Sequence, residues 1–183
     1  FSAAYTFDAG DRPQGQLAVG DFNGDGRSDV AVPALYGNTI KVYLGHPTNI
    51  LSLNHTYQNA FRADALAAID MDGDGKLDLV VGGGSTLSVR KGFGDGTFEP
   101  FSGTGDDWID LPDIHENIAL GDLDGTGQPD VALTHYAYDL PNGGLSILLN
   151  AAPGDSVSPG RVTNAGFMSG NRQVGLSWVT PTD

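Results

Sequence analysis

Short apolar segments, each bounded by glycine, aspartate or proline, recur along the first 150 residues of the chain. Within residues 40–44 and 86–90 the apolar and polar positions alternate, which is the period-2 pattern of a strand with one buried face. The other segments are short apolar runs between turn residues. The pattern therefore predicts an all-β chain whose main strands are 17–22, 29–32, 40–44, 66–69, 77–81, 86–90, 118–120, 131–134 and 145–149.

These strands fall into three groups that repeat about every 50 residues. A repeat of this length indicates an array of similar supersecondary units. Each group fits a four-stranded antiparallel meander, the unit of a β-propeller blade. The blades are predicted at about 16–62, 65–115 and 117–150, and residues 1–10 are predicted to be the outer strand of a preceding blade. The third blade lacks an outer strand of its own in this pattern.

Two parts of the pattern are less regular. Residues 46–60 show no clear alternation, and Tyr57 and Phe61 are the candidates for an outer strand there. In the second blade, the glycine-rich hairpin 92–98 is predicted to lead into the outer strand. Residues 102–115 are then predicted to form a longer insertion at the end of the second blade.

A nine-residue acidic loop joins the first two strands of each blade. In the second loop, residues 70–78, carboxylates occupy positions 1, 3, 5 and 9 and would repel one another without a cation between them. Hard divalent ions, Ca²⁺ above all, favour about six to eight oxygen ligands. Glycines at positions 4 and 6 allow the bends that turn alternate side chains inward. A solvated acidic turn is the alternative for any one loop, but the threefold recurrence favours three Ca²⁺ sites.

The predicted ligands occupy positions 1, 3, 5, 7 and 9 of each loop. They are Asp21, Asn23, Asp25, Arg27 and Asp29; Asp70, Asp72, Asp74, Lys76 and Asp78; and Asp122, Asp124, Thr126, Gln128 and Asp130. Lys76 is expected to give only its backbone carbonyl while its side chain points to water. The loops are not EF-hands, because position 12 is apolar where an EF-hand needs a bidentate glutamate. Thr126 replaces a carboxylate at position 5, so the third site is predicted to be the weakest.

The stretch 20–26, Gly-Asp-Phe-Asn-Gly-Asp-Gly, followed by the strand 29–32, resembles the FG-GAP or VCBS repeat. The turn 94–98, Gly-Asp-Gly-Thr-Phe, is similar to the one that closes the bacterial version of this repeat. The resemblance covers residues 1–150 and implies calcium at the five loop positions. Such repeats build the propellers of integrin α-subunits and of many secreted bacterial proteins. No single activity is implied, because the repeat occurs in adhesins, lectins, polysaccharide lyases and toxin shells.

The composition changes after Asn150. Residues 151–160 form a linker rich in proline, glycine and serine. In residues 161–183 the apolar side chains Val174, Leu176 and Trp178 alternate. This segment resembles the first two strands of a fibronectin type III domain of the bacterial spacer kind. A complete sandwich of that kind needs about seven strands in roughly 100 residues, so the domain is predicted to be truncated.

The net charge of −14 is partly explained by the loops, which contain ten of the 23 acidic residues. Three Ca²⁺ ions would reduce it to about −8, which still argues against nucleic acid or anionic lipid as a partner. The absence of cysteine excludes disulfides and fits a bacterial exported protein. No apolar run approaches the roughly 20 residues of a membrane span. Weak calcium loops work where calcium is millimolar, so we expect a secreted or cell-surface protein.

The sequence contains no evident catalytic constellation. The four histidines lack metal-ligand spacing, and the paired carboxylates are already assigned to calcium. Two functions remain open. The first is an extracellular calcium-binding propeller module that acts as a binding or adhesion scaffold for carbohydrate or protein ligands. The alternative is a non-catalytic or partial region of a secreted polysaccharide-degrading enzyme, a lyase or a glycoside hydrolase.

A partner surface is expected on the side opposite the metal loops. The aromatic and histidine side chains predicted there are Trp108, Tyr36, His135, Tyr136 and Tyr138. Such rings stack on sugars or anchor protein ligands, although packing between blades is the alternative for each of them. Three blades cannot close a propeller. We therefore expect the remainder of the parent polypeptide, or a second copy of the chain, to complete the ring.

Overall fold

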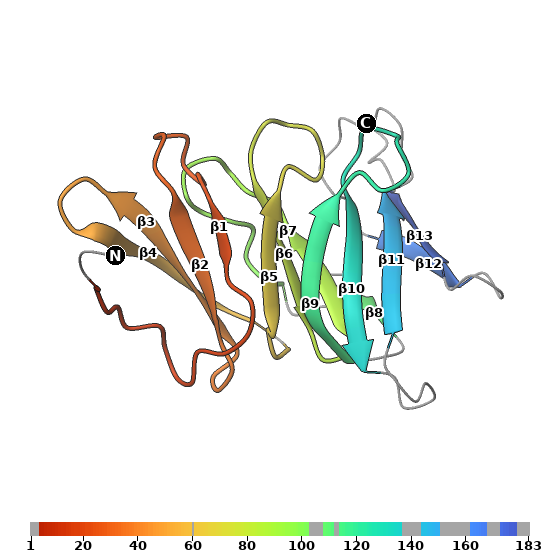
Figure 1. Cartoon of the computed structure of the whole chain (residues 1–183), viewed down its shortest axis with the longest axis horizontal. Coiled ribbons are helices and arrows are strands. Elements are labelled where there is room, and N and C mark those ends of the chain that lie inside the picture. Colours follow the sequence, from red (N-terminus) through yellow and green to blue (C-terminus); the bar gives the residue numbers. More distant parts are fainter. Residues whose placement is uncertain are drawn as a thin grey trace.

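The computed structural model describes residues 4–59, 61–102, 108–111, 114–136, 144–150, 162–167 and 173–178. These residues form thirteen strands in three sheets and no helix, which confirms the all-β prediction (Figure 1). Accordingly, the described part of the chain contains no helix able to span a membrane.

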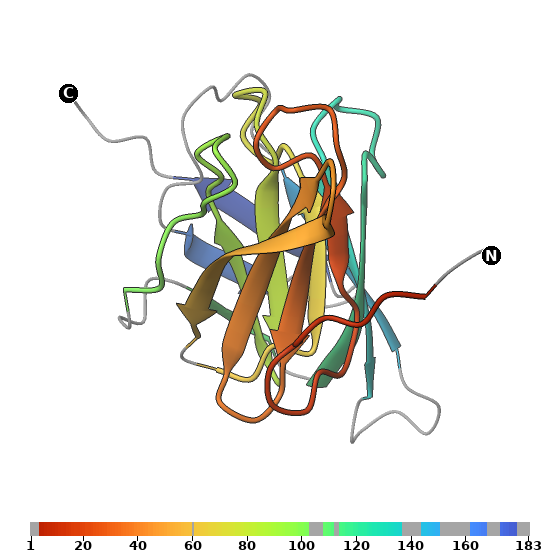
Figure 2. The ribbon, with the colours of Figure 1, turned by 90° about the vertical axis from the view of Figure 1, so that its left-hand side faces the viewer.

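The first sheet is an antiparallel meander of β1 (Ala18–Gly20), β2 (Asp29–Ala34), β3 (Thr39–His46) and β4 (Ile50–Gln58). Ile40 and Val42 alternate on β3 and are completely buried, as the pattern predicted. The outer strand β4 pairs along all of β3, although its sequence looked irregular. Most of β4 is exposed and only Tyr57 is buried, so burial imposes no alternation on it. Figure 2 looks from the side of this sheet, with the other two sheets behind it.

The second sheet contains β5 (Ala65–Ile69), β6 (Asp78–Gly83), β7 (Thr86–Arg90) and the two-residue β8 (Ile109–Asp110). The outer strand thus lies inside the segment that the sequence pattern assigned to an insertion. The hairpin 92–98 is closed by a bridge between Gly92 and Phe98. Only Ile109 is buried in β8, and a strand that short leaves no periodic signal.

The third sheet has the order β9 (Ile114–Gly121), β10 (Asp130–Tyr136), β11 (Gly144–Asn150), β13 (Gln173–Trp178) and β12 (Val162–Phe167). The third blade was predicted to lack an outer strand, but β13 takes that place. It runs parallel to β11 because the chain first returns through β12, its antiparallel partner. β12 and β13 are the strands expected to begin a fibronectin type III domain. Here they extend a blade, and that domain assignment stays a prediction.

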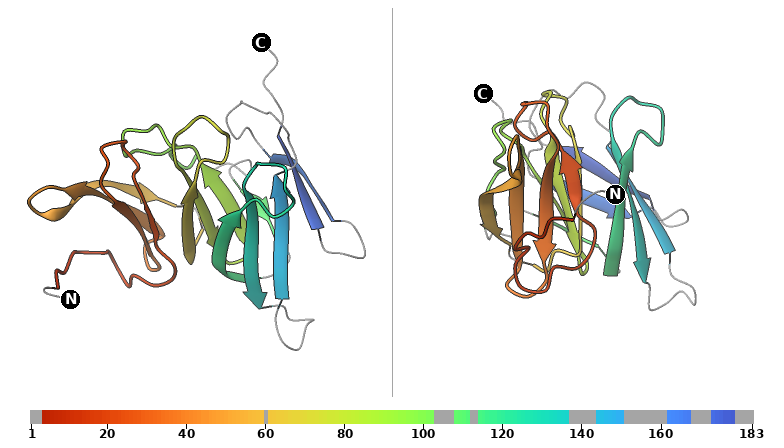
Figure 3. Two further views of the ribbon diagram at one scale, coloured as in Figure 1. Left: turned by 45° about the horizontal axis from the view of Figure 1, so that its top comes forward. Right: turned by 60° about the vertical axis from the view of Figure 1, so that its left-hand side comes forward.

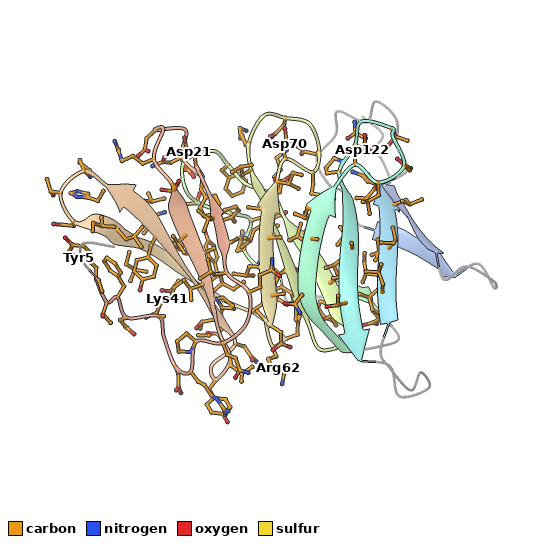
Figure 4. All side chains as sticks on the ribbon, in the orientation of Figure 1. Tyr5, Asp21, Lys41, Arg62, Asp70 and Asp122 are labelled. Carbon is orange, nitrogen blue, oxygen red and sulfur yellow. The ribbon has the colours of Figure 1, made fainter. Side chains whose placement is uncertain are left out.

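The described residues 4–10 form no strand, contrary to the outer strand predicted for residues 1–10. They lie along β3 of the first sheet, where Phe7 packs on Tyr43 at a ring-centroid distance of 6.1 Å. The carbonyl of Asp8 accepts a hydrogen bond from the Tyr43 hydroxyl, and its carboxylate lies 2.8 Å from Lys41 Nζ. Residues 4–7 have no strand partner among the described residues, and the segment ends at Gly10, whose φ of 91° a regular strand excludes. Tyr5 and Lys41 lie on this side of the molecule (Figure 4).

The three sheets stand side by side in chain order, with the inner strands β1, β5 and β9 adjacent to one another (Figures 1 and 3). Apolar residues fill the two spaces between them. The core between the first and second sheets contains Ala18, Phe22, Ala31, Ile40, Val42, Tyr57, Leu66, Leu79, Val81 and Phe98. The core between the second and third contains Met71, Val80, Leu87, Ile109, Ile118, Val131, Leu133 and Leu148. This is the packing of neighbouring propeller blades, so we call the sheets the first, second and third blade.

The face that each blade turns toward the preceding blade is its incoming flank. Leu66 in the second blade and Ile118 in the third occupy equivalent positions there and are 0 % and 4 % exposed. The equivalent residue of the first blade, Leu17, is 48 % exposed, and its neighbour Val19 is also exposed. The first blade therefore carries the same apolar incoming flank, and the described residues place no blade against it.

The face turned toward the following blade is the outgoing flank. At position 2 of the metal loop, Phe22 and Met71 pack against the next blade and are buried, whereas the equivalent Leu123 is 54 % exposed. On the third strand, Leu87 is fully buried and the equivalent Leu145 is 62 % exposed. The outgoing flank of the third blade therefore repeats the pattern of the other two and remains uncovered among the described residues.

Gln16 joins the three blades just before β1. Its side-chain amide donates to the Ile118 carbonyl at 2.9 Å, and its side-chain oxygen accepts from the Ile118 N–H at 3.0 Å. Its backbone N–H donates to Asp64, and its carbonyl accepts from Leu66. The Gln16 side chain thus makes the pair of hydrogen bonds with the Ile118 backbone that a neighbouring strand residue would make, and it links the first and third blades.

We expect Gln16→Ala to lower the free energy of unfolding by about 1–3 kcal/mol, because the backbone groups of Ile118 lose their partners. Urea denaturation monitored by circular dichroism measures this difference. Gln14→Ala, two residues away at an exposed position, is the control and should stay within about 0.5 kcal/mol of the wild type. Equal stabilities for the two variants would contradict the bridging role of Gln16.

Candidate metal centres

The three acidic loops lie at one edge of the molecule. Each connects the first two strands of its blade, and Asp21, Asp70 and Asp122 stand along the same edge in Figure 4. The loops therefore share one side of the blade array, as the meander topology predicts.

The aspartate at position 1 organises each loop. Asp70 accepts hydrogen bonds from the backbone N–H groups of Gly73, Asp74 and Gly75 at 2.8–3.1 Å. Gly73 and Gly75 have φ angles of 77° and 85°, a region that residues with a Cβ rarely adopt. Asp21 and Asp122 accept the same type of bonds in their loops. The alternation of aspartate and glycine is thus what folds the loop.

The aspartate at position 9 has a second task that the sequence did not reveal. Asp29, Asp78 and Asp130 are completely buried. In each, one carboxylate oxygen accepts the N–H of loop position 2, and the other accepts the N–H of a residue at the end of the third strand. These bonds are 2.7–2.9 Å long. Position 9 therefore ties the loop to the third strand of the same blade.

Burial raises the pKa of the Asp78 carboxyl to about 6. The N–H groups of Gly92 and Met71 oppose this shift, and the negative charges of Asp72 and Asp74 add to it. The second loop therefore holds several carboxylates close together, one of them buried, and a bound cation would offset their mutual repulsion.

The ligand geometry of the second and third loops fits one hard cation each. Carboxylate oxygens of Asp70, Asp72 and Asp78 lie within 4.8 Å of one another, and so do those of Asp122, Asp124 and Asp130. Oxygens bound to one Ca²⁺ at about 2.3–2.6 Å are at most about 5 Å apart, so these groups can share an ion. In the first loop, Asn23 supplies an amide oxygen at position 3 and donates to Asp25 at 3.0 Å.

Side chains at positions 5 and 7 pair with each other in the first two loops. The Lys76 side chain is exposed to water, as expected, and its Nζ lies 3.4 Å from the Asp74 carboxylate. In the first loop, Arg27 pairs with Asp25 at 2.6 Å in the same way. Long cationic side chains at position 7 fold back because the position-5 carboxylate is two residues away on the same side. In the third loop, Thr126 at position 5 donates its hydroxyl to Asp124 at 2.7 Å.

Lys91 is a contact of the second loop that the sequence analysis missed. Its Nζ lies 2.7 Å from Asp72 and 3.0 Å from Asp74, although it follows Asp72 by 19 residues. Burial opposes the charge of Lys91, but the hydrogen bonds to Asp72 and Asp74 outweigh it and raise the pKa of its ammonium.

The residues predicted for a ligand surface come from three different blades. Tyr36 lies in the turn between β2 and β3, is half exposed, and has the Arg12 guanidinium 5.0 Å from its ring centroid. His135 and Tyr136 end β10, where their side chains are outside the described set, and Tyr138 lies outside the described residues.

Trp108 directly precedes β8 and is half-buried. Its ring stacks on Phe101 at 5.4 Å and meets Phe61 edge-on at 6.4 Å, while its Nε1 donates to Asp110 at 3.1 Å. Trp108 is thus part of an aromatic cluster and retains some exposure.

A hollow of about 350 Å³ lies beside the first loop. Its lining includes Asp25, Arg27, His46 and Asn54. No local sequence pattern marks this hollow, because its residues come from the loop, the end of β3 and β4.

Comparison with known families agrees with the repeat structure. Residues 70–133 match the model of an FG-GAP-like repeat, and residues 14–46 match that of an FG-GAP repeat. No curated protein matches the chain significantly. The two matches together contain the three acidic loops, the strands β2 and β6 that follow the first two loops, and most of β10 after the third, so the chain is an FG-GAP repeat protein.

Proposed function

We propose that this chain is an extracellular calcium-binding β-propeller module whose three loops each hold one Ca²⁺. The observation that carries the proposal is the convergence of loop carboxylates within 4.8 Å in the second and third blades. Three carboxylates at that distance are stable together when a cation lies between them. The ligands would be the residues at the five loop positions, with position 7 contributing its backbone carbonyl.

Calcium in these loops would stabilise the fold and perform no chemistry. Each loop connects the first two strands, and its position-9 aspartate holds the third, so an ion at the loop fixes three strands of a blade. Extracellular sites of this kind bind with a Kd of roughly 10⁻⁴ to 10⁻³ M. They would be filled where calcium is millimolar, which is why we place the protein outside the cytosol, secreted or at the cell surface.

Thermal unfolding with and without calcium tests this proposal. At a tenfold excess of Ca²⁺ over its Kd, each site adds about 1.4 kcal/mol to the free energy of unfolding. We therefore expect the melting temperature to rise with calcium and to fall when EDTA is added. Magnesium at the same concentration is the control, because its small octahedral shell suits a loop of protein oxygens poorly. Identical melting curves in calcium and EDTA would rule the proposal out.

The matched pair Asp74→Ala and Thr126→Ala refines the test, since both residues occupy position 5. In calcium, Asp74→Ala should lower the melting temperature more, because a charged ligand is lost where Thr126→Ala removes a hydroxyl. In EDTA the two variants should differ less.

We also propose that further blades cover the two open flanks, supplied by the parent polypeptide or by a second copy of the chain. A complete propeller would act as a binding or adhesion scaffold for a carbohydrate or protein ligand. Trp108, Tyr36, His135, Tyr136 and Tyr138 are the residues that we propose for ligand contact. The partly exposed ring of Trp108 supports this for one of them.

A further inference from the structure

We propose that Lys91 is a built-in competitor for calcium at the second loop and holds the affinity of this site below the value that its four carboxylates would give. The inference rests on the proposed calcium role of the loops. It concerns which of the three sites fills first as the calcium concentration rises.

The contacts of Lys91 place its charge among predicted ligands. Its Nζ is 2.7 Å from one oxygen of Asp72 and 3.0 Å from one oxygen of Asp74, at loop positions 3 and 5. The Asp72 side chain is almost completely buried, and that of Lys91 is mostly buried. Water therefore screens this pair less than it screens the exposed pair between Arg27 and Asp25. A Ca²⁺ ion that uses the same carboxylates must displace the ammonium or bind beside it.

The repeat shows that this cation belongs to the second blade. The residue after Lys91, Gly92, donates its N–H to the position-9 aspartate, and Gly45 and Asn150 do the same in the other blades. The positions equivalent to Lys91 are therefore Leu44 and Leu149. No backbone requirement asks for lysine at this place, since two of the three blades have leucine there.

A comparison of the charges at the three loops changes the expected order of their calcium affinities. The second loop has four carboxylates, and Lys76 and Lys91 both pair with them. The first loop has three, and Arg27 pairs with one of them. The third loop also has three, and no lysine or arginine of the described residues pairs with them. The loop with the most carboxylates is thus the most neutralised, and the third loop need not be the weakest site.

Glycine amides report on each loop separately. The position-6 glycines, Gly26, Gly75 and Gly127, each donate their N–H to the position-1 aspartate of their own loop at 2.8–2.9 Å. Calcium binding at a loop should shift the NMR resonance of that amide. A Ca²⁺ titration of ¹⁵N-glycine-labelled protein therefore gives three midpoints from one sample, and the first and third loops serve as internal controls.

We expect Lys91→Leu to move the Gly75 midpoint to about tenfold lower calcium, because it removes a unit charge close to a divalent ion. The midpoints of Gly26 and Gly127 should stay unchanged. Lys91→Arg keeps the charge and should leave the Gly75 midpoint within about twofold of the wild type. Lys91→Gln removes the charge and keeps a polar side chain, so it should behave like Lys91→Leu and replaces it if that variant does not fold.

The outcomes separate the inference from the proposed function. A Gly75 midpoint that stays in place or moves to higher calcium in the uncharged variants overturns the role of Lys91, while calcium binding itself stands. If none of the three amides of the wild type responds to calcium, the proposed function fails and the inference falls with it.

Discussion

In calcium, replacing Asp78 with alanine should lower the free energy of unfolding by about 3–5 kcal/mol. The buried carboxylate accepts the N–H groups of Met71 and Gly92 at 2.9 and 2.8 Å. Alanine leaves both donors buried without an acceptor, at about 1–3 kcal/mol each, and removes a metal ligand as well. Chemical denaturation of the two proteins at equal calcium concentration measures the difference.

The same substitution in EDTA separates the two roles of Asp78. Without the ion the cost should fall to about 2 kcal/mol, because the wild-type fold then carries the penalty of ionising a carboxyl whose pKa is raised to about 6. It should not vanish, since both N–H groups still lose their acceptors. Asp74→Ala is the control, because the Asp74 carboxylate is more exposed and the backbone N–H that it accepts, from Lys76, belongs to its own loop. If Asp78→Ala leaves the free energy of unfolding in EDTA unchanged, the aspartate at position 9 acts as a metal ligand alone.

The blade cores could be predicted because local pattern and burial agree in them. Ile40 and Val42 alternate with Lys41 in the sequence, and in β3 they are buried while Lys41 is only partly buried. Residues 86–90 also form a strand at the predicted positions. The loop and its two flanking strands are also local features. By contrast, β8 is two residues long and β4 is largely exposed, so nothing in their own sequence marks their pairing. The place of β13 next to β11 depends on a chain reversal through β12, which periodicity does not encode.

The candidate metal sites could likewise be predicted only in part. The loop positions could be predicted because their spacing is fixed by the backbone of nine consecutive residues. The second hydrogen bond of Asp78 and the contacts of Lys91 were missed, because these partners are 14 to 19 residues away in the sequence and meet through strand pairing. An alignment of the three repeats would have marked Lys91, since it sets a lysine against Leu44 and Leu149.

In solution, the 183-residue chain should associate through its open flanks into a pair of molecules. The incoming flank of the first blade, with Leu17 and Val19, has the pattern that packs on a preceding blade elsewhere in this structure. The outgoing flank of the third, with Leu123 and Leu145, has the pattern that packs on a following one. Two copies related by a twofold axis can bring these flanks together twice and so form a ring of six blades.

Light scattering should therefore give twice the mass of one chain in calcium, with dissociation on dilution. Leu145→Glu puts a charge into the proposed interface and should yield the mass of a single chain. Phe93→Glu is the control, because Phe93 is comparably exposed but belongs to the second blade, which has a neighbour on each side. A wild-type chain that stays single at every concentration, with one sharp melt in calcium, would show that these flanks do not pair with each other.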